Sequence, residues 1–227
     1  MLNKIKGGLI VSCQALENEP LHSSFIMGRM ALAAKQGGAV AIRSNSVDDI
    51  NEIKKITGLP VIGLIKSDYN GSEVYITPTL AEVYTLLSTD CEIIAVDATK
   101  RKRPNGDSLK TVIDVIHKAN RLAMADISTF EEAKEAEKLG FDLVSTTLAG
   151  YTDYSYQNEG PDYKVVEECV KGLSIPVIAE GRISTLSELE EMLKYDVFAV
   201  VIGSAITRPQ YITEKFYNVI KSKKASS

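Results

Sequence analysis

Hydrophobic residues along the chain fall into two kinds of segment that alternate from one end to the other. One kind is a short, nearly continuous apolar run rich in Val, Ile and Ala, which is typical of a parallel strand buried on both faces. The other kind has apolar residues at helical spacing, and it often begins at a Ser or Thr cap and ends at a Gly. The predicted strands are 8–13, 39–43, 60–66, 91–97, 121–126, 142–147, 176–180 and 197–203. The predicted helices are 21–35, 47–56, 79–87, 108–117, 129–138, 162–171, 186–194 and 210–221.

This regular alternation over short connections indicates parallel strands joined by crossover helices. Eight such units in 227 residues approach the ~250 residues usual for a closed barrel, so we predict a single (β/α)8 TIM-barrel domain over residues 1–227. An open doubly wound sheet is the alternative. It is disfavoured because the Gly-x-Gly-x-x-Gly turn expected after its first strand is replaced here by Cys13-Gln14-Ala15-Leu16. We expect residues 222–227 to form a disordered tail.

Composition narrows the class of protein further. The net charge is −4 with acids and bases mixed along the chain, which argues against a nucleic-acid surface, and we interpret the basic segment 100–103 as a solvated loop. No apolar run approaches the ~20 residues of a membrane span, and the first residues lack the features of a signal peptide. The three cysteines and two histidines share no metal-ligand spacing, so we predict a reduced, cytoplasmic protein without a metal site.

Charged residues directly end five of the apolar runs, and they are Arg43, Lys66, Asp97, Asp126 and Glu180. A single such charge usually just reaches solvent, but the carboxyl ends of parallel barrel strands all meet at one mouth, where these folds carry their chemistry. Lys66 is the best candidate for a general base, because partial burial lowers a lysine pKa from ~10.4 toward ~7–8. An ion pair of Lys66 with Asp97 or Glu180 is the structural alternative. The third and seventh strands lie on opposite walls, so Lys66 and Glu180 are placed to flank a planar intermediate.

A second group of residues follows the last two strands, where barrels of this kind usually bind phosphate. Gly181 and Gly203 allow close approach of backbone N–H groups, and Ser204, Arg182 and Arg208 add hydrogen-bond donors. The longest predicted loop, 148–161, carries Tyr151, Tyr154 and Tyr156, which either form a mobile lid or pack the loop down.

Six segments of the chain resemble the bacterial N-acetylmannosamine-6-phosphate 2-epimerase family, and the resemblance runs nearly end to end. They are GLIVSCQAL (8–16), VIGLIK (61–66), MAD (124–126), TTLAGYT (146–152), IAEGR (178–182) and VIGSAITRP (201–209). The resemblance implies a single-domain barrel of the ribulose-phosphate-binding type. It also implies interconversion of N-acetylmannosamine 6-phosphate and N-acetylglucosamine 6-phosphate, a step of sialic acid breakdown, with no metal or organic cofactor.

The resemblance also suggests roles for individual residues. Lys66 would remove the C2 proton of the open-chain sugar, and Glu180 would return a proton to the other face or assist ring opening. The expected substrate-binding residues are Gln14, Arg43, Asp126 and Tyr151. The expected phosphate-binding residues are Gly181, Arg182, Gly203, Ser204 and Arg208.

Other functions remain open on the sequence alone. Lys66 would also suit the Schiff base of a class I aldolase acting on a keto sugar acid, and a barrel that binds phosphosugars as a regulator is a third possibility. A cyclase-type barrel is disfavoured, because the first strand ends in Cys13-Gln14 rather than an acid. The last helix carries Ile212, Phe216, Val219 and Ile220 on one face, which either closes the barrel or packs on a partner, and we favour a homodimer.

Overall fold

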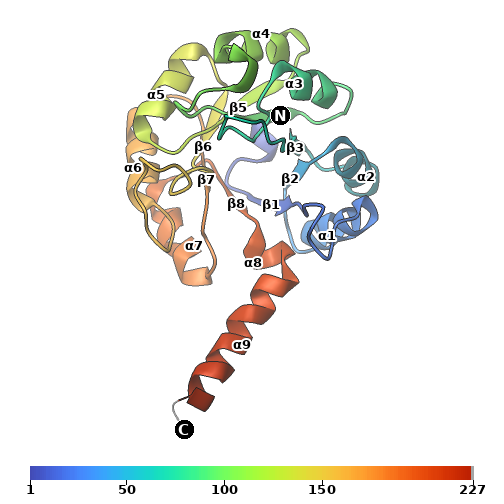
Figure 1. The fold of residues 1–227 in the computed structure, drawn as a ribbon, viewed down its shortest axis with the longest axis vertical. Coiled ribbons are helices and arrows are strands. Elements are labelled where there is room, and N and C mark those ends of the chain that lie inside the picture. The colour runs from blue at the N-terminus through green and yellow to red at the C-terminus, as the bar shows by residue number, and fades with distance from the viewer. Residues whose placement is uncertain (226–227) are drawn as a thin grey trace.

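The structure, a computed structural model, describes residues 1–225 and consists of a closed barrel of eight parallel strands in the order β1 to β8. Helices cover the outside of the barrel as a ring (Figure 1). This architecture confirms the predicted single (β/α)8 barrel. The strands are β1 Leu9–Cys13, β2 Ala41–Asn45, β3 Val61–Leu64, β4 Ile93–Asp97, β5 Leu122–Asp126, β6 Leu143–Ser145, β7 Val177–Glu180 and β8 Ala199–Ile202.

The helices begin and end largely where capping signals predict. Ser46 caps α2 by accepting a hydrogen bond from the Asp49 amide, and Thr129 forms a capping box with Glu132 at α5. The helices are α1 Ser24–Gln36, α2 Val47–Thr57, α3 Leu80–Leu86, α4 Leu109–Lys118, α5 Phe130–Leu139, α6 Tyr163–Gly172, α7 Leu186–Met192, α8 Ser204–Thr207 and α9 Pro209–Ala225. Short 3-10 turns are η1 Leu2–Lys4, η2 Pro104–Gly106 and η3 Leu193–Tyr195. The sequence did not predict the short helix α8.

Side chains from one face of every strand fill the barrel interior. Register pairs such as Ile10 with Ala41 and Ile178 with Ala199 bring these side chains to the same level, and they belong to one buried apolar cluster. Alternate residues point outward and pack under the helices in a second, larger cluster. Because successive side chains alternate between the two faces, the next inward position on each strand lies at the carboxyl-terminal mouth.

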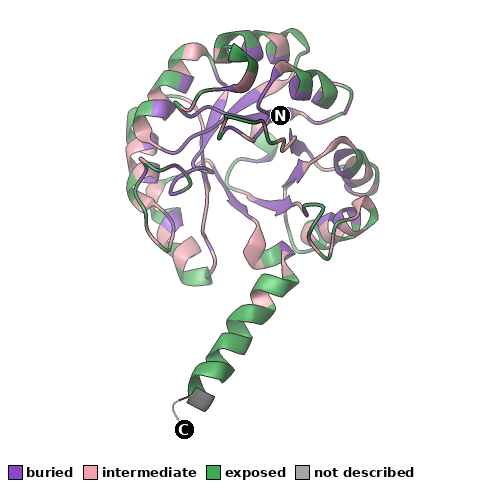
Figure 2. Ribbon diagram, viewed as in Figure 1, coloured by how far each residue is buried: buried purple, intermediate pink, exposed green. Residues whose placement is uncertain are grey.

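The last helix, α9, runs away from the barrel instead of lying against it (Figure 1). Its surface is exposed along nearly its whole length (Figure 2), including the large apolar side chains of Phe216, Val219 and Ile220. The helix extends through Ala225 and therefore includes most of the segment 222–227 for which we expected disorder. Residues 226 and 227 lie outside the described part of the chain. No helix within residues 1–225 combines the length and the apolar character that a membrane span requires.

Candidate active site

The polar layer at the barrel mouth follows from the alternation of side chains along each strand. Two residues after the inward-facing Ala41, Met124 and Ile178 come Arg43, Asp126 and Glu180. Strands β2, β5 and β7 therefore deliver charged side chains to the mouth of the barrel, directly above an apolar floor. Arg43 and Asp126 are buried at this level, so their charges interact more strongly than charges on the surface.

Arg43 is the centre of a buried ion cluster. Its Nη2 donates to Asp126 Oδ2 at 2.6 Å, and its Nη1 donates to Asp126 Oδ1 at 2.9 Å and to Glu180 Oε2 at 2.7 Å. The side chains of Arg43 and Asp126 are 1% and 0% exposed. The Thr147 hydroxyl lies 2.9 Å from both Asp126 Oδ1 and Glu180 Oε2 and bridges the two carboxyl groups. The single positive charge of Arg43 thus balances the carboxylates of both Asp126 and Glu180.

This excess of carboxylates changes the acidity of Glu180. Burial raises the pKa of Glu180, Arg43 opposes the rise, and Asp126 adds to it. The Oε2 atom accepts hydrogen bonds from Arg43, Thr147 and Ser145, whereas Oε1 has no hydrogen-bond partner within residues 1–225. Glu180 lines the cavity at the mouth, and it is able to exchange a proton with a bound molecule there.

Lys66 follows β3 on the wall opposite β7. Its backbone N–H donates to Asn45 Oδ1 at 2.9 Å, and its backbone pairs with Ile76 in an antiparallel bridge, so the start of the loop is fixed on both sides. Burial lowers the pKa of Lys66 to about 8, helped by the positive charges of Arg43 and Arg208 and opposed by Glu180 and Glu19. Such a lysine is partly neutral near physiological pH, as a general base requires.

The ion-pair alternative for Lys66 does not hold in the described part of the chain. Glu180 is paired with Arg43, and Asp97 is paired with Arg101 at 2.6 Å. Neither carboxylate forms a salt bridge with the Lys66 amine. The amine therefore faces the cavity without a fixed anionic partner among residues 1–225.

A cavity of about 530 Å³ at the mouth brings the predicted site residues together. Of the residues predicted to act in catalysis, substrate binding or phosphate binding, only Asp126 does not line it, because Asp126 is fully buried behind Arg43. The cavity wall includes Gln14, Arg43, Lys66, Tyr151, Glu180, Gly181, Arg182, Gly203, Ser204 and Arg208. Several lining residues were missed by the sequence analysis, among them Ser12, Tyr75 and Thr147. The sequence could have indicated Thr147, because it is the last residue of a predicted strand. Tyr75 could not have been found in this way, because the loop that returns to pair with Ser67 brings it to the cavity.

The two arginines predicted to bind phosphate have different surroundings. Arg208 forms an ion pair with Glu19, with Nε 2.9 Å from Oε1. Arg182 donates to the carbonyl oxygens of Gly150, at 2.6 Å, and Asn158, and its guanidinium lies 4.8 Å from the centre of the Tyr151 ring. Arg182 therefore fastens the loop after β6 over the cavity, in addition to facing the cavity itself.

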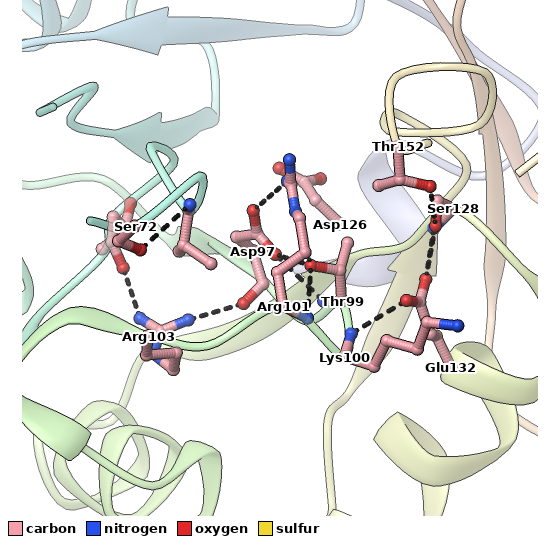
Figure 3. Close-up of polar contacts among 12 residues, drawn as sticks. Ser72, Asp97, Thr99, Lys100, Arg101, Arg103, Asp126, Ser128, Glu132 and Thr152 are labelled. Carbon is pink, nitrogen blue, oxygen red and sulfur yellow. Dashed lines mark hydrogen bonds and ion pairs between the residues drawn. The ribbon is translucent and has the colours of Figure 1, made fainter. Parts of the chain in front are cut away.

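The fifth strand-end charge, Asp97, is not part of the cavity wall. Arg101 and Arg103 turn back from the loop after β4, where Arg103 Nη1 donates to the Asp97 carbonyl oxygen at 2.6 Å (Figure 3). Arg103 is buried, so the prediction of a simply solvated loop at 100–103 was wrong for these two side chains. Lys100 instead stacks 3.6 Å from the ring centre of Tyr154, which packs this loop down.

The fold and the cavity define a class: a (β/α)8 barrel with a lysine amine, unpaired among residues 1–225, and a carboxylate at the carboxyl ends of its strands. Comparison with known proteins gives the family. Residues 27–222 match the family described as "Putative N-acetylmannosamine-6-phosphate epimerase". The chain belongs to this family.

Individual relatives cover almost the whole chain. A protein of Clostridium perfringens strain SM101 named "Putative N-acetylmannosamine-6-phosphate 2-epimerase" is 63% identical over 221 residues, which is 97% of this chain and 100% of that protein. A Clostridioides difficile protein of the same name is 59% identical, covering 97% of this chain and 99% of that protein. The solved structure of the N-acetylmannosamine-6-phosphate 2-epimerase from Clostridium perfringens superposes with a TM-score of 0.95 at 63% identity, covering 96% of each chain.

Proposed function

We propose that this chain is an N-acetylmannosamine-6-phosphate 2-epimerase, which interconverts N-acetylmannosamine 6-phosphate and N-acetylglucosamine 6-phosphate. The observation that carries the proposal is the Lys66 amine, which has a pKa lowered to about 8 and faces the same cavity as Glu180 from the opposite wall. Family membership favours this activity over a Schiff-base aldolase and over a regulator without catalysis.

The reaction follows from the chemistry of the open-chain sugar. The C2 proton is weakly acidic because C2 is next to the C1 aldehyde. Lys66 takes this proton, the C2–H electron pair becomes the C1–C2 double bond, and the carbonyl electrons move to the C1 oxygen. Arg43 lines the cavity and supplies positive charge near this developing anion. Asp126 holds the Arg43 guanidinium from behind.

Return of a proton to the opposite face of C2 then gives the other epimer. We assign this step to Glu180, because its pKa is raised by burial and its Oε1 is available to the cavity. Gln14 and Tyr151 contact polar groups of the sugar. The phosphate binds at Gly181, Arg182, Gly203, Ser204 and Arg208, at the start of the four-residue helix α8. The Ile206 and Thr207 N–H groups donate to the Gly203 carbonyl oxygen, whereas the N–H groups of Ser204 and Ala205 precede these bonds and are available to an anion.

Proton NMR of N-acetylmannosamine 6-phosphate with the protein in D₂O tests this function. We expect loss of the C2 proton signal and appearance of the C2-deuterated gluco epimer. Lys66→Ala should abolish both while leaving the circular dichroism spectrum and the Tm unchanged. Folded wild-type protein that produces neither epimer nor exchange contradicts the proposal. In that case borohydride trapping with a keto sugar acid tests the aldolase alternative, since a Schiff base at Lys66 would become covalent.

We also propose that the protein is a homodimer in which α9 packs on a second copy. An isolated helix is marginally stable in water, and α9 runs away from the barrel beyond its start next to α8 (Figure 1). It carries Phe216, Val219 and Ile220 in exposed positions. Further exposed leucines, Leu186 of α7 and Leu193 of η3, offer apolar surface on the barrel.

Light scattering after size-exclusion chromatography tests the dimer. Phe216→Glu should shift the mass from dimer to monomer, and a wild-type monomer at micromolar concentration contradicts the proposal. A cytoplasmic location is supported by the three buried, unpaired cysteines, Cys13, Cys91 and Cys169.

A further inference from the structure

Arg208 is held from outside the cavity by a carboxylate that the mechanism has not used. Its Nε lies 2.9 Å from Glu19 Oε1, and its Nη2 donates to Glu19 Oε2 at 3.0 Å. This is a two-point contact between a planar guanidinium and a carboxylate, which fixes the orientation of both groups. Glu19 belongs to the loop between β1 and α1, whereas Arg208 lies between α8 and α9.

The contact uses only one edge of the guanidinium. Glu19 Oε1 lies 2.9 Å from Nε as an ion pair, and Glu19 Oε2 accepts one hydrogen bond from Nη2. Nη1 has no hydrogen-bond partner in the described chain. Arg208 lines the cavity beside Gly203 and Ser204, whereas Glu19 does not line it. Because the guanidinium is rigid and planar, anchoring the outer edge directs the donors of the other edge.

Glu19 is itself fixed in place. Its Oε2 accepts the Leu16 backbone N–H at 2.8 Å, and its Oε1 lies 3.3 Å from Gln210 Nε2 at the start of α9. The side chain is only 15% exposed. A carboxylate held by its own loop, by Arg208 and by α9 has little freedom to move away, so the ion pair is preorganised before any ligand binds.

We propose that Glu19 is a positioning residue of the phosphate site, which holds Arg208 so that its free donors face the substrate phosphate. The proposal rests on the proposed function to the extent that Arg208 binds the phosphate of the sugar. It adds a residue from the first loop, far from the phosphate-binding loops in sequence, to the recognition of that group.

Glu19 has a second electrostatic consequence at Lys66. Its negative charge raises the pKa of Lys66, against the lowering by burial and by the arginines. Removing the charge should therefore lower the Lys66 pKa further. The shift of the pH profile therefore reports the loss of the Glu19 charge near Lys66, whereas a rise in KM with little change in kcat reports the loss of its contact with Arg208.

The test compares Glu19→Gln with Glu17→Gln, which removes the same charge from an exposed position in the same loop. We expect Glu19→Gln to raise KM for N-acetylmannosamine 6-phosphate roughly 10-fold, about 1.4 kcal/mol, with little change in kcat. The pH profile of kcat/KM should also move to lower pH. Glu19→Asp, which keeps the charge but shortens the side chain, should raise KM less. Glu17→Gln should match the wild type.

A double-mutant cycle with Arg208→Ala tests whether Glu19 acts through Arg208. In the Arg208→Ala background, Glu19→Gln should produce no further increase in KM. An unchanged or lower KM in Glu19→Gln, or an equal increase in both backgrounds, overturns the proposal. A lower KM would mean that the carboxylate competes with phosphate for Arg208.

Calorimetric titration with inorganic phosphate separates this inference from the activity. Wild-type protein should bind phosphate more tightly than Glu19→Gln, and this result stands even if the sugar is not epimerised. If the wild type epimerises the sugar but both proteins bind phosphate equally, the role of Glu19 is wrong and the proposed function survives. Absence of phosphate binding to the wild type also overturns the proposal.

Discussion

Replacing Glu180 by Gln should separate the two halves of the reaction. Gln is nearly the same size and keeps an oxygen for the hydrogen bonds from Arg43 and Thr147, but it has no acidic proton to deliver. If Lys66 removes the C2 proton and Glu180 returns one to the other face, Glu180→Gln should stop epimerisation. It should still allow Lys66 to exchange the C2 hydrogen of one epimer with water.

The pH dependence of that exchange follows from the structure. With a pKa of about 8, roughly one tenth of Lys66 is neutral at pH 7, compared with about 3 in 10,000 for a lysine at the ordinary value of 10.5. The lowered pKa of Lys66 therefore increases the reactive fraction about 300-fold. In Glu180→Gln one of the two negative charges that raise the Lys66 pKa is gone, so exchange should rise with pH with a midpoint at or below about pH 8.

The assay follows the C2 position of each epimer, prepared with deuterium at C2 and incubated in ordinary water, by proton NMR from pH 6 to 9. We expect a C2 proton signal to appear in one epimer without formation of the other, and no signal with Lys66→Ala. Epimerisation at the wild-type rate in Glu180→Gln would show that one base serves both faces. Loss of both exchange and epimerisation would mean that Glu180 acts before the proton transfer, for example in ring opening. An exchange rate that still rises tenfold per pH unit up to pH 9 would refute the lowered pKa of Lys66.

Three further predictions concern stability. Arg43→Met leaves the fully buried Asp126 without its cation and should lower the free energy of unfolding by about 3–5 kcal/mol in urea titration. The control, Arg29→Met on an exposed helix face, should change the free energy of unfolding by less than about 0.5 kcal/mol. The folded-state pKa of Glu180 lies above its usual 4.5, so its ionisation destabilises the fold. Glu180→Gln should therefore raise the Tm at pH 8 and lose this advantage below about pH 4.5, where the wild-type carboxyl group is protonated in both states. Equal gains in Tm at both pH values would contradict the raised pKa. Thr129→Ala removes the side-chain cap of α5 and should cost about 1 kcal/mol by the same urea titration, and a negligible loss would show that the capping box is not needed.

The sequence predicted the barrel and most of its mouth because both depend on local, periodic signals. Apolar runs separated by capped helices define the strand–helix units, and the alternation of side chains along a strand places Arg43 and Glu180 on the inner face. Asp97 has the same periodic position, but Arg101, four residues later, covers its carboxylate. The alternation of side chains along a strand does not predict which side chains of the following loop will cover the end of that strand.

The contacts that the sequence did not predict join segments that are distant in the chain. Tyr75 reaches the cavity because its loop returns to pair with Ser67, and Glu19 meets Arg208 across most of the length of the protein. The apolar stripe of α9 was recognised, but its periodicity is the same whether the helix covers its own barrel or packs on another molecule. The direction in which α9 leaves the barrel depends on tertiary packing, which has no periodic signature.

The position of Arg43 explains how a lysine and a glutamate share one cavity without neutralising each other. If Arg43 were absent, the Lys66 ammonium and the Glu180 carboxylate would be free to pair as ions, and the lysine would stay protonated. Arg43 occupies Glu180 Oε2 at 2.7 Å, and its charge also lowers the pKa of Lys66. The same cation limits the rise that burial causes in the pKa of Glu180. One buried arginine thus helps burial to lower the pKa of the base and orients the acid, and Asp126 behind it holds that arginine in place.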